Sequence, residues 1–383
     1  MIKVREDNKL DIALVGIILA ITIFGVLMVY SASNYYALVT SNDPFNLVKR
    51  QGIYASLGVM LMFIIAYCVD YKVFSNIIIS VTIYILANLS VVALLFIGYE
   101  SNGATRWIRI GSFSFQPSEL AKVATILLLS TVIERYRSKL DDVRFLILCL
   151  VIILIPGVLV LREDMSSAIV IVAASLLILF VSTPQIWYYV AGVIVGIVGI
   201  FYTLFLAATI DPNVQITGIL GMILPQYRLN RFRVWLDPWT DPYGFGYQPI
   251  QSLYAIGSGG LFGQGFGMSI QKQGFLPEPH NDIIFSVICE ELGLVGASVV
   301  LIAYSIFVFK GFLVALNAKD LFGSLVASGL VGLVAIQVII NVGVNTNLFP
   351  TTGMQLPLIS YGGTAIIVLL ASLGILLNIS KHV

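Results

Sequence analysis

Charged residues are scarce in this sequence of 383 residues. Lysine and arginine contribute 21 residues and aspartate and glutamate 20, which together make up only 11% of the chain. A typical soluble domain carries about 25% charged residues, so this composition excludes an ordinary water-facing globular fold. The net charge of +1 gives no basic excess that would attract a nucleic acid.

Cysteine and histidine are rarer still. The three cysteines, Cys68, Cys149 and Cys289, stand far apart in or at the end of apolar runs and form no CxxC pair. This spacing favours small buried residues over disulfides or metal ligands. Two histidines cannot build a histidine-rich metal site. We therefore expect no metal site made by protein ligands alone, although a divalent cation such as Mg²⁺ could accompany a substrate.

Apolar residues dominate what remains. Hydrophobic residues make up 58% of the chain, and mean hydropathy is +0.97. Apolar runs long enough to cross a membrane as helices occur at 11–33, 49–69, 75–97, 118–135, 142–161, 165–182, 185–209, 283–312, 320–349 and 355–380. The runs are continuous, whereas a membrane barrel needs period-two alternation. The sequence predicts an all-α polytopic membrane protein of about ten transmembrane helices, with residues 1–383 forming one membrane domain.

The distribution of basic residues predicts the orientation. Lys3, Arg5 and Lys9 precede the first run, whose apolar core is too long for a cleaved signal peptide, so we interpret it as an anchor. The basic cluster ERYRSKLDDVR at 134–144 fits a cytoplasmic loop. Ten spans then place both termini in the cytoplasm. Residues 210–282, between spans seven and eight, form a large extracytoplasmic loop.

Basic residues near that outer surface form two groups. Arg106, Trp107 and Arg109 lie in TRWIRIGSFSFQPSELAK, which continues into a Pro-initiated helix. Glu119 and Lys122 follow within that helix at a spacing of i,i+3, so they can pair on one face. The pair is either a structural ion pair or part of a functional path through the membrane.

The outer loop holds the second group, Arg228, Arg231 and Arg233. They are either solvated surface charge or a site for a phosphate-bearing ligand. The glycine-rich AIGSGGLFGQGFG lacks the Gly-Lys-Ser/Thr of a phosphate loop, which favours tight turns and close packing. A polar stripe, Gln337, Asn341 and Asn345, recurs every four residues on span nine. It serves either interhelical hydrogen bonding or a polar groove.

Four carboxylates gather in GFLPEPHNDIIFSVICEELG, at 274–293. Asp282 lies just before span eight, where it could cap the helix or act as a general base. Asn281 could cap equally well, which would leave Asp282 free. Glu278 is a candidate for sugar or metal binding. Of Glu290 and Glu291, two turns deeper, we expect at least one to pair structurally.

Several long motifs together resemble the SEDS family (shape, elongation, division, sporulation). They are WIRIGSFSFQPSELAK, DPWTDPYGFGYQPIQSLYAIGSGGLFGQGFG, FLPEPHNDIIFSVICEELG and TTGMQLPLISYGG, and the likeness extends from about residue 10 to 380. GVLMVYSAS and the Lys49-Arg50 pair are more similar to the FtsW and SpoVE members than to RodA. Two departures are Asn281, where members usually have threonine, and Glu163-Asp164-Met165-Ser166-Ser167, where many have Pro-Asp-Leu-Gly-Thr.

The resemblance implies a function in the bacterial cytoplasmic membrane. Members polymerise lipid II into peptidoglycan beside a class B penicillin-binding protein, a transpeptidase, within the divisome or a related cell-wall complex. The family's essential aspartate falls on Asp282, its tryptophan on Trp107, and its glutamate and lysine on Glu119 and Lys122. A lipid II flippase is the alternative function. Division, sporulation and elongation stay open as biological roles.

The chemistry of polymerisation fits these residues. The acceptor hydroxyl must lose a proton as it attacks the anomeric carbon, so one carboxylate such as Asp282 suffices as base. An α-linked donor and a β-linked product require one inversion. The undecaprenyl diphosphate leaving group calls for arginine, lysine or a metal ion to neutralise its growing charge.

Overall fold

The computed structural model describes residues 9–101, 104–110, 113–162, 164–183, 187–209 and 226–383. Within these residues the long helices are α1 (Ile12–Ser41), α2 (Asn46–Cys68), α3 (Ile77–Ile97), α4 (Pro117–Arg135), α5 (Val143–Leu161), α6 (Met165–Ser182), α7 (Trp187–Thr209), α11 (Ile284–Asn317), α12 (Leu321–Asn345) and α13 (Gly363–Ser380). Shorter helices are α9 (Gln226–Leu236) and α10 (Tyr247–Gly259), with 3₁₀ turns at Tyr71–Ser75, Arg137–Lys139 and Pro238–Thr240.

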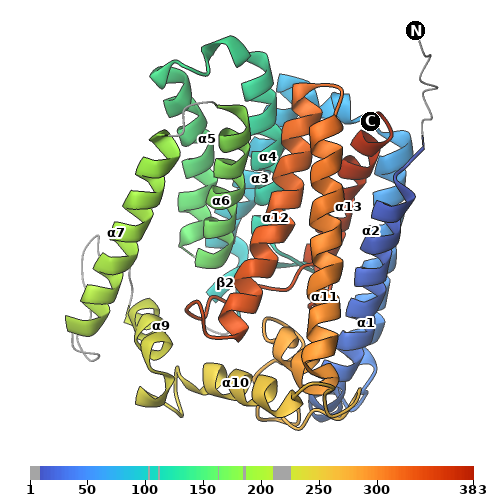
Figure 1. Cartoon of the computed structure of the whole chain (residues 1–383), viewed down its shortest axis with the longest axis vertical. Coiled ribbons are helices and arrows are strands. Elements are labelled where there is room, and N and C mark those ends of the chain that lie inside the picture. The colour runs from blue at the N-terminus through green and yellow to red at the C-terminus, as the bar shows by residue number, and fades with distance from the viewer. Residues whose placement is uncertain (1–8, 102–103, 111–112, 163, 184–186, 210–225) are drawn as a thin grey trace.

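The long helices stand side by side in a bundle (Figure 1). Eight of them, α1, α2, α3, α5, α6, α11, α12 and α13, are long and apolar enough to cross a membrane. The helices α4 and α7 fall on the two remaining predicted spans, 118–135 and 185–209. Four charged residues, Glu119, Lys122, Glu134 and Arg135, set α4 apart from the other helices. The predicted helical, polytopic fold is confirmed.

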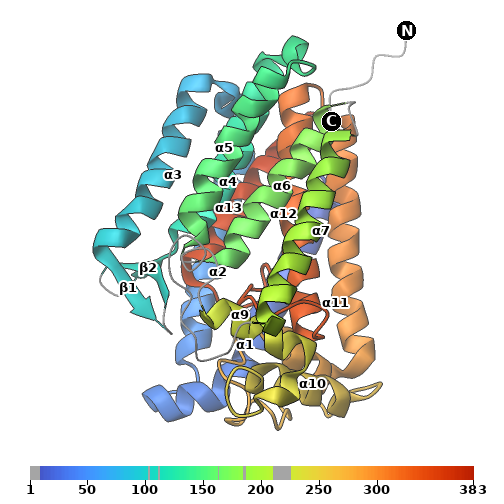
Figure 2. The same cartoon turned by 90° about the vertical axis from the view of Figure 1, so that its left-hand side faces the viewer.

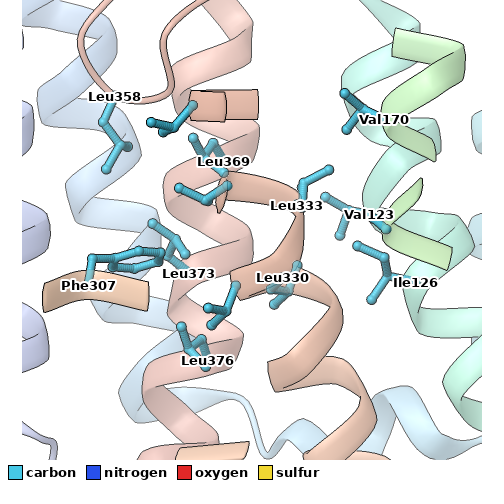
Figure 3. Packing of buried hydrophobic residues seen from close by; sticks show 14 of the residues in the cluster. Val123, Ile126, Val170, Phe307, Leu330, Leu333, Leu358, Leu369, Leu373 and Leu376 are labelled. Carbon is cyan, nitrogen blue, oxygen red and sulfur yellow. The ribbon is translucent and has the colours of Figure 1, made fainter. Parts of the chain in front are cut away.

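The helix α12 lies at the centre of the bundle. It packs against α11, α6, α4 and α13. Figure 3 shows Leu330 and Leu333 of α12 between Leu369 of α13 and Val123 and Ile126 of α4. Small residues let these backbones approach closely, as is usual between helices in membranes. A Cβ on Gly329, for example, would lie 2.7 Å from the Ile178 side chain.

Both ends of the described chain lie at one end of the bundle. The backbone N–H of Asp11 donates to Oγ of Ser380 over 3.4 Å, so the start of α1 lies beside the end of α13. The helices α9 and α10 lie at the opposite end (Figures 1 and 2). This arrangement agrees with an even number of spans. Residues 210–225 of the predicted outer loop lie outside the described residues.

A small antiparallel sheet between α3 and α4 is an addition to the predicted helices. It consists of β1 (Gly98–Ser101), β2 (Ala104–Ile110) and β3 (Phe113–Phe115), in the order β1-β2-β3. Trp107 pairs with Tyr99, and Arg109 pairs with Ser114. The sheet lies at the end of the bundle that carries α9 (Figure 2). It fixes the segment that contains Arg106 and Trp107.

Two predicted spans end differently from the helices. The first helix continues to Ser41, eight residues beyond the predicted end at 33. The predicted tenth span, 355–380, begins as helix only at Gly363. Between α12 and α13 the chain passes through Pro350, Pro357 and the left-handed residues Asn347, Gly353 and Leu358. These prolines and left-handed residues are incompatible with a continuous helix, and the resulting loop lines the cavity described below.

The glycine-rich segment packs into a break in α11. Gly293 has φ 66° and ψ −168°, which interrupts the helix. The N–H groups of Gln264 and Gly265 donate to the carbonyls of Glu290 and Glu291, both over 2.9 Å. A Cβ on Gly263 would lie 2.2 Å from the carbonyl oxygen of Glu291. The prediction that these glycines serve turns and close packing is confirmed.

Candidate active site

A cavity of about 690 Å³ lies between the end of the bundle and the α9–α10 region. Its walls come from segments far apart in sequence: the end of α1, β2, the starts of α4 and α6, α9, α10, the segment 277–282, and the loop before α13. The volume falls within the range of small-molecule sites, about 300–1,000 Å³. Of the predicted site residues, it is lined by Arg106, Trp107, Glu119, Arg231, Glu278, Asp282 and Gln337.

Asp282 is half-buried at this cavity and does not cap α11. The N-cap residue of α11 is Ile283, and no side chain makes the capping bond. Oδ2 of Asp282 instead accepts a long hydrogen bond of 3.4 Å from Gln248 of α10. Asn281, the other candidate cap, donates its side-chain amide to Glu278 over 2.6 Å. The carboxylate of Asp282 is therefore free to face a ligand.

The environment of Asp282 suits a proton acceptor. Burial raises the pKa of its carboxyl group, and the charge of Glu278 raises it further. The hydrogen bond from Gln248 and the charge of Arg231 only partly offset this, so the pKa lies above its ordinary value. A base whose pKa is closer to the working pH takes up a proton more readily.

Two asparagines of the predicted polar stripe hold the backbone of Asp282. The side-chain amides of Asn341 and Asn345 donate to the Asp282 carbonyl over 2.8 and 3.0 Å. Asn341 also donates to the carbonyl of Met354, and Asn345 accepts from Ser286. Both asparagines are buried and neither lines the cavity. Their amides are occupied by protein groups, so they position Asp282 instead of binding substrate; only Gln337 of the stripe reaches the cavity.

Arg106 and Arg231 form a basic wall of the same cavity. Arg231 donates to the carbonyl of Thr351 over 3.1 Å, which ties α9 to the loop before α13. Arg106 lies near the carboxylate of Asp164. Two guanidinium groups on one wall are suited to an anionic ligand such as a diphosphate.

Asp164 anchors this basic wall. Its carboxylate accepts hydrogen bonds from Ser166, Ser167 and Gln116 over 2.8, 2.8 and 3.2 Å. Burial alone would raise its pKa, but the charge of Arg106 and the serine hydrogen bonds outweigh burial, and the pKa lies below its ordinary value. Asp164 therefore stays charged, while Asp282 is poised to accept a proton.

The remaining predicted arginines lie away from the main cavity. Arg109 is exposed and stacks over Tyr99 of the sheet, 5.6 Å from the ring centroid. Arg228 donates to the carbonyls of Leu161 and Arg162 and lines a separate space of about 30 Å³. Arg233 donates to the carbonyl of Ala207, which joins α9 to α7. Of the three α9 arginines, only Arg231 lines the main cavity. Arg228, one turn earlier on the same face, lines the smaller space with it.

Glu119 and Lys122 form the predicted ion pair. Nζ of Lys122 lies 2.7 Å from Oε1 of Glu119, and the Lys122 side chain is only 1% exposed. Glu119 lines the cavity, whereas Lys122 lies behind it in α4. The pairing is confirmed, and the lysine ammonium reaches the cavity only through Glu119.

Glu290 and Glu291 are structural, as predicted for at least one of them. Glu291 pairs with Lys272 over 2.6 Å and accepts from Ser31 of α1 over 2.6 Å. Glu290 accepts from the N–H groups of Ile270 and Gln271. Both carboxylates are buried and fasten the outer loop to α1 and α11. Of the four carboxylates in this segment, Glu278 and Asp282 therefore line the cavity, whereas Glu290 and Glu291 make structural contacts.

Several lining residues were not predicted as site residues, although Asp164, Ser166 and Ser167 belong to a segment noted as a departure from the family pattern. They are Tyr36, Gln116, Asp164, Ser166, Ser167, Gln248, His280 and the loop residues 353–358. The sequence around Asp164 could have indicated a site, because this aspartate precedes a helix and is followed by two serines. No local pattern marks Gln248 or residues 353–358, since tertiary packing alone brings them to the cavity. Within the described residues, no three His, Cys, Asp or Glu side chains gather to hold a metal ion.

Comparison with known proteins identifies the family. The family model described as "Cell cycle protein", which covers FtsW, RodA and SpoVE, matches residues 12–383. The chain belongs to this family. The Bacillus subtilis stage V sporulation protein E is 37% identical over 97% of this chain and 97% of its own. A probable peptidoglycan glycosyltransferase FtsW from Geobacter metallireducens is 38% identical over 100% of this chain and 97% of its own.

Solved structures agree with this membership. A chain in a structure on the coordination of polymerization and crosslinking by a peptidoglycan synthase complex superimposes with a TM-score of 0.75. It is 29% identical in sequence and is covered to 98%, while 97% of this chain is covered. This member of the family is a multi-pass membrane protein whose cavity lies at one end of its helix bundle.

Proposed function

We propose that this chain is a peptidoglycan glycosyltransferase that polymerises lipid II on the outer face of the bacterial cytoplasmic membrane. The name of its Geobacter relative, probable peptidoglycan glycosyltransferase, supports the reaction class. The observation that carries the proposal is one cavity with a half-buried carboxylate, Asp282, and a basic wall, Arg106 and Arg231. The stage V sporulation relative and the FtsW relatives support a role in sporulation or division.

In this proposal Asp282 is the general base. Its carboxylate takes the proton of the acceptor 4-hydroxyl as that oxygen attacks the anomeric carbon of the donor. The new glycosidic C–O bond forms while the bond from that carbon to the diphosphate oxygen breaks, which inverts the α-linked donor into a β-linked product. The raised pKa of Asp282 favours this proton uptake.

Arg106 and Arg231 receive the leaving group. They neutralise the negative charge that develops on undecaprenyl diphosphate as the bond breaks. Glu119 and Trp107 line the same cavity and are proposed to orient the sugars. Lys122 acts through Glu119, whose carboxylate it holds at 2.7 Å. Glu278 is proposed to support the sugar side, next to Asp282.

A divalent cation fits this arrangement only together with the substrate. Mg²⁺ in proteins commonly uses one or two carboxylates plus substrate phosphates. Glu278 would supply a carboxylate at the cavity while Asp282 remains the base, and the diphosphate would supply further oxygens. When bound, the ion would add positive charge at the leaving group.

The proposed partner is a class B penicillin-binding protein, a transpeptidase. The similar solved chain belongs to a complex that couples polymerization with crosslinking, which supports a partner of that kind. We propose that this chain works within the divisome or a related cell-wall complex. Residues 1–383 would form one membrane domain, with 210–282 as its extracytoplasmic loop.

Purified chain in proteoliposomes with labelled lipid II tests the proposal. We expect glycan strands on gels, alone or with the partner present. A flippase would instead move labelled lipid II between leaflets and produce no strands. Translocation without strands under all conditions would replace the glycosyltransferase by the transporter.

A further inference from the structure

His280 occupies a protected position at the cavity wall. It lies two residues before Asp282, lines the cavity, and is only 4% exposed. Its ring packs between two tyrosines, with centroids 4.9 Å from Tyr36 of α1 and 5.6 Å from Tyr361. An aromatic cavity wall with a few fixed polar atoms is typical of small-molecule sites.

The backbone around His280 is fixed. Its carbonyl accepts from the N–H of Tyr361 over 2.9 Å. The next carbonyl, of Asn281, accepts from Oγ of Ser360 over 2.6 Å. The backbone of residues 280 and 281 is therefore joined to the loop before α13, which holds the backbone that carries the imidazole in place.

One ring nitrogen of His280 has no hydrogen-bond partner within the described part of the chain. Among the described residues, eight buried side-chain atoms have no hydrogen-bond partner, and Nδ1 of His280 is one of them. It is the only one of the eight that belongs to a residue lining the main cavity. Leaving a buried polar atom unpaired costs about 1–3 kcal/mol. An unpaired buried atom calls for an explanation, and because His280 lines the cavity we take a bound ligand as the group that completes its bonding.

The imidazole suits a sugar ligand. A histidine ring has two nitrogens that can donate or accept hydrogen bonds. These groups match the hydroxyl and acetamido groups of a sugar, whereas the arginines on the other wall match a diphosphate.

We propose that His280, flanked by Tyr36 and Tyr361, is a binding residue that contacts the saccharide of the substrate through its ring. This inference rests on the proposed function, because the sugar is that of lipid II. His280 is then a binding residue, and the proton transfer remains with Asp282.

Three replacements at His280 test this contact. His280→Phe keeps a ring between the tyrosines but removes both nitrogens, while His280→Asn and His280→Gln each restore an amide at the position of one nitrogen. The other histidine, His382, lies at the far end of the bundle against Tyr71, so His382→Phe controls for the loss of an imidazole away from the cavity. Initial polymerisation rates are measured against lipid II concentration.

We expect His280→Phe to raise KM for lipid II about tenfold, as the loss of one hydrogen bond predicts, with kcat little changed. At least one amide variant should recover most of that loss, and His382→Phe should match the wild type. Wild-type kinetics in His280→Phe would overturn the proposal. So would a fall in kcat alone, or equal losses in all three variants together with lowered thermal stability.

A spectroscopic readout separates this proposal from the proposed function. The chain has two histidines, so ¹⁵N-histidine labelling in nanodiscs gives two imidazole spin systems, assigned with the two Phe variants. Adding lipid II should shift the His280 signals and leave those of His382 unchanged. A shift without glycan strands would support the contact and refute the polymerase. Glycan strands without a shift of the His280 signals would support the polymerase and refute the contact.

Discussion

At the scale of single residues, two aspartates of the cavity have pKa values shifted in opposite directions. Asp164 is surrounded by donors and Arg106, so its pKa is lowered. Among the described residues, Asp282 accepts only one long hydrogen bond from another side chain, that of Gln248, and burial raises its pKa. The same carboxyl chemistry is thus divided between an anchor that stays charged and the proposed base, Asp282.

His280 makes the stability of the fold depend on pH. Its pKa is about 4 in the folded chain and about 6.5 when unfolded. The unfolded chain therefore binds more protons between these values, and this contribution to stability is lost as pH falls from about 6.5 to about 4. We expect the wild type to lose more thermal stability than His280→Phe between pH 7 and pH 4.5.

Thermal unfolding in detergent at several pH values measures this difference. Asp164 and Asp282 also titrate differently from unfolded chain, but they are present in both proteins and cancel in the comparison. Parallel curves for wild type and His280→Phe would show that His280 is not held neutral by burial.

Residue identity in the cavity was only partly predictable from the sequence. Asp282 and Glu278 stood out because charged residues are rare in this chain and these two lie beside an apolar run. Arg231 stood out as one of three arginines clustered in the outer loop. His280 was visible as one of two histidines, but nothing local indicated two tyrosines from distant segments around it. The division of the three α9 arginines depends on helix phase and tertiary contacts, which no local pattern fixes.

At the scale of elements, α12 supports the backbone of Asp282 through two asparagine side chains. Asn345 donates to the carbonyls of Asp282 and Asn341 and accepts from Ser286. Asn378 of α13 makes comparable buried bonds at the far end, to the carbonyl of Ala66 and the N–H of Tyr71. The two asparagines are matched in burial but differ in distance from the cavity.

Replacing each asparagine by alanine separates support from stability. We expect Asn345→Ala and Asn378→Ala each to lose about 1–3 kcal/mol of stability, because each leaves buried groups unpaired. Only Asn345→Ala should also reduce polymerisation, by roughly tenfold, since misplacement of a catalytic group is costly. Equal activity in the two variants, measured at a temperature where both stay folded, would contradict the supporting role.

The ion pair of α4 gives a second test at this scale. Lys122→Met should cost about 3–5 kcal/mol of stability, because Glu119 is left without its partner in a largely buried position. Polymerisation should fall as well, since Glu119 lines the cavity. In Glu119→Gln with Lys122→Met, stability should return but activity should not. Recovery of both in the double variant would make the pair purely structural.

Helix positions followed well from apolar runs, but their ends did not. Ten runs predicted ten helices, because length and hydropathy suffice for a membrane span. The loop 346–362 was predicted in part as the ends of two spans, because its sequence is largely apolar. In the structure its prolines and left-handed residues interrupt the helix there. The sheet at 98–115 was missed because its strands are only three to seven residues long.

At the scale of the whole molecule, the structure places the cavity and both described chain ends at opposite ends of the bundle. The orientation in the membrane remains a prediction from the basic cluster at 134–144. If it is correct, the cavity opens on the side where lipid-linked precursors are polymerised outside the cell.

Single cysteines test the orientation in intact cells. In a background without Cys68, Cys149 and Cys289, we expect Tyr243→Cys to react with an impermeant thiol reagent and Ser138→Cys to stay protected until the cells are opened. Tyr243 is 93% exposed and Ser138 is also exposed, so access is not limited by the fold. The reverse labelling pattern would invert the topology and place the cavity in the cytoplasm.

The central claim is that Asp282 is the base of a lipid II polymerase, and the rate of strand formation by Asp282→Asn tests it most directly. The matched control is Asp237→Asn, an exposed aspartate of the outer region whose oxygen bonds the N–H of Trp239, a bond that asparagine preserves. The account predicts that Asp282→Asn inserts and folds like the wild type but polymerises labelled lipid II about 10²–10⁴-fold more slowly, while Asp237→Asn is unchanged. Asp282→Asn with more than about a tenth of the wild-type rate would contradict the assignment, because loss of a general base costs more than that.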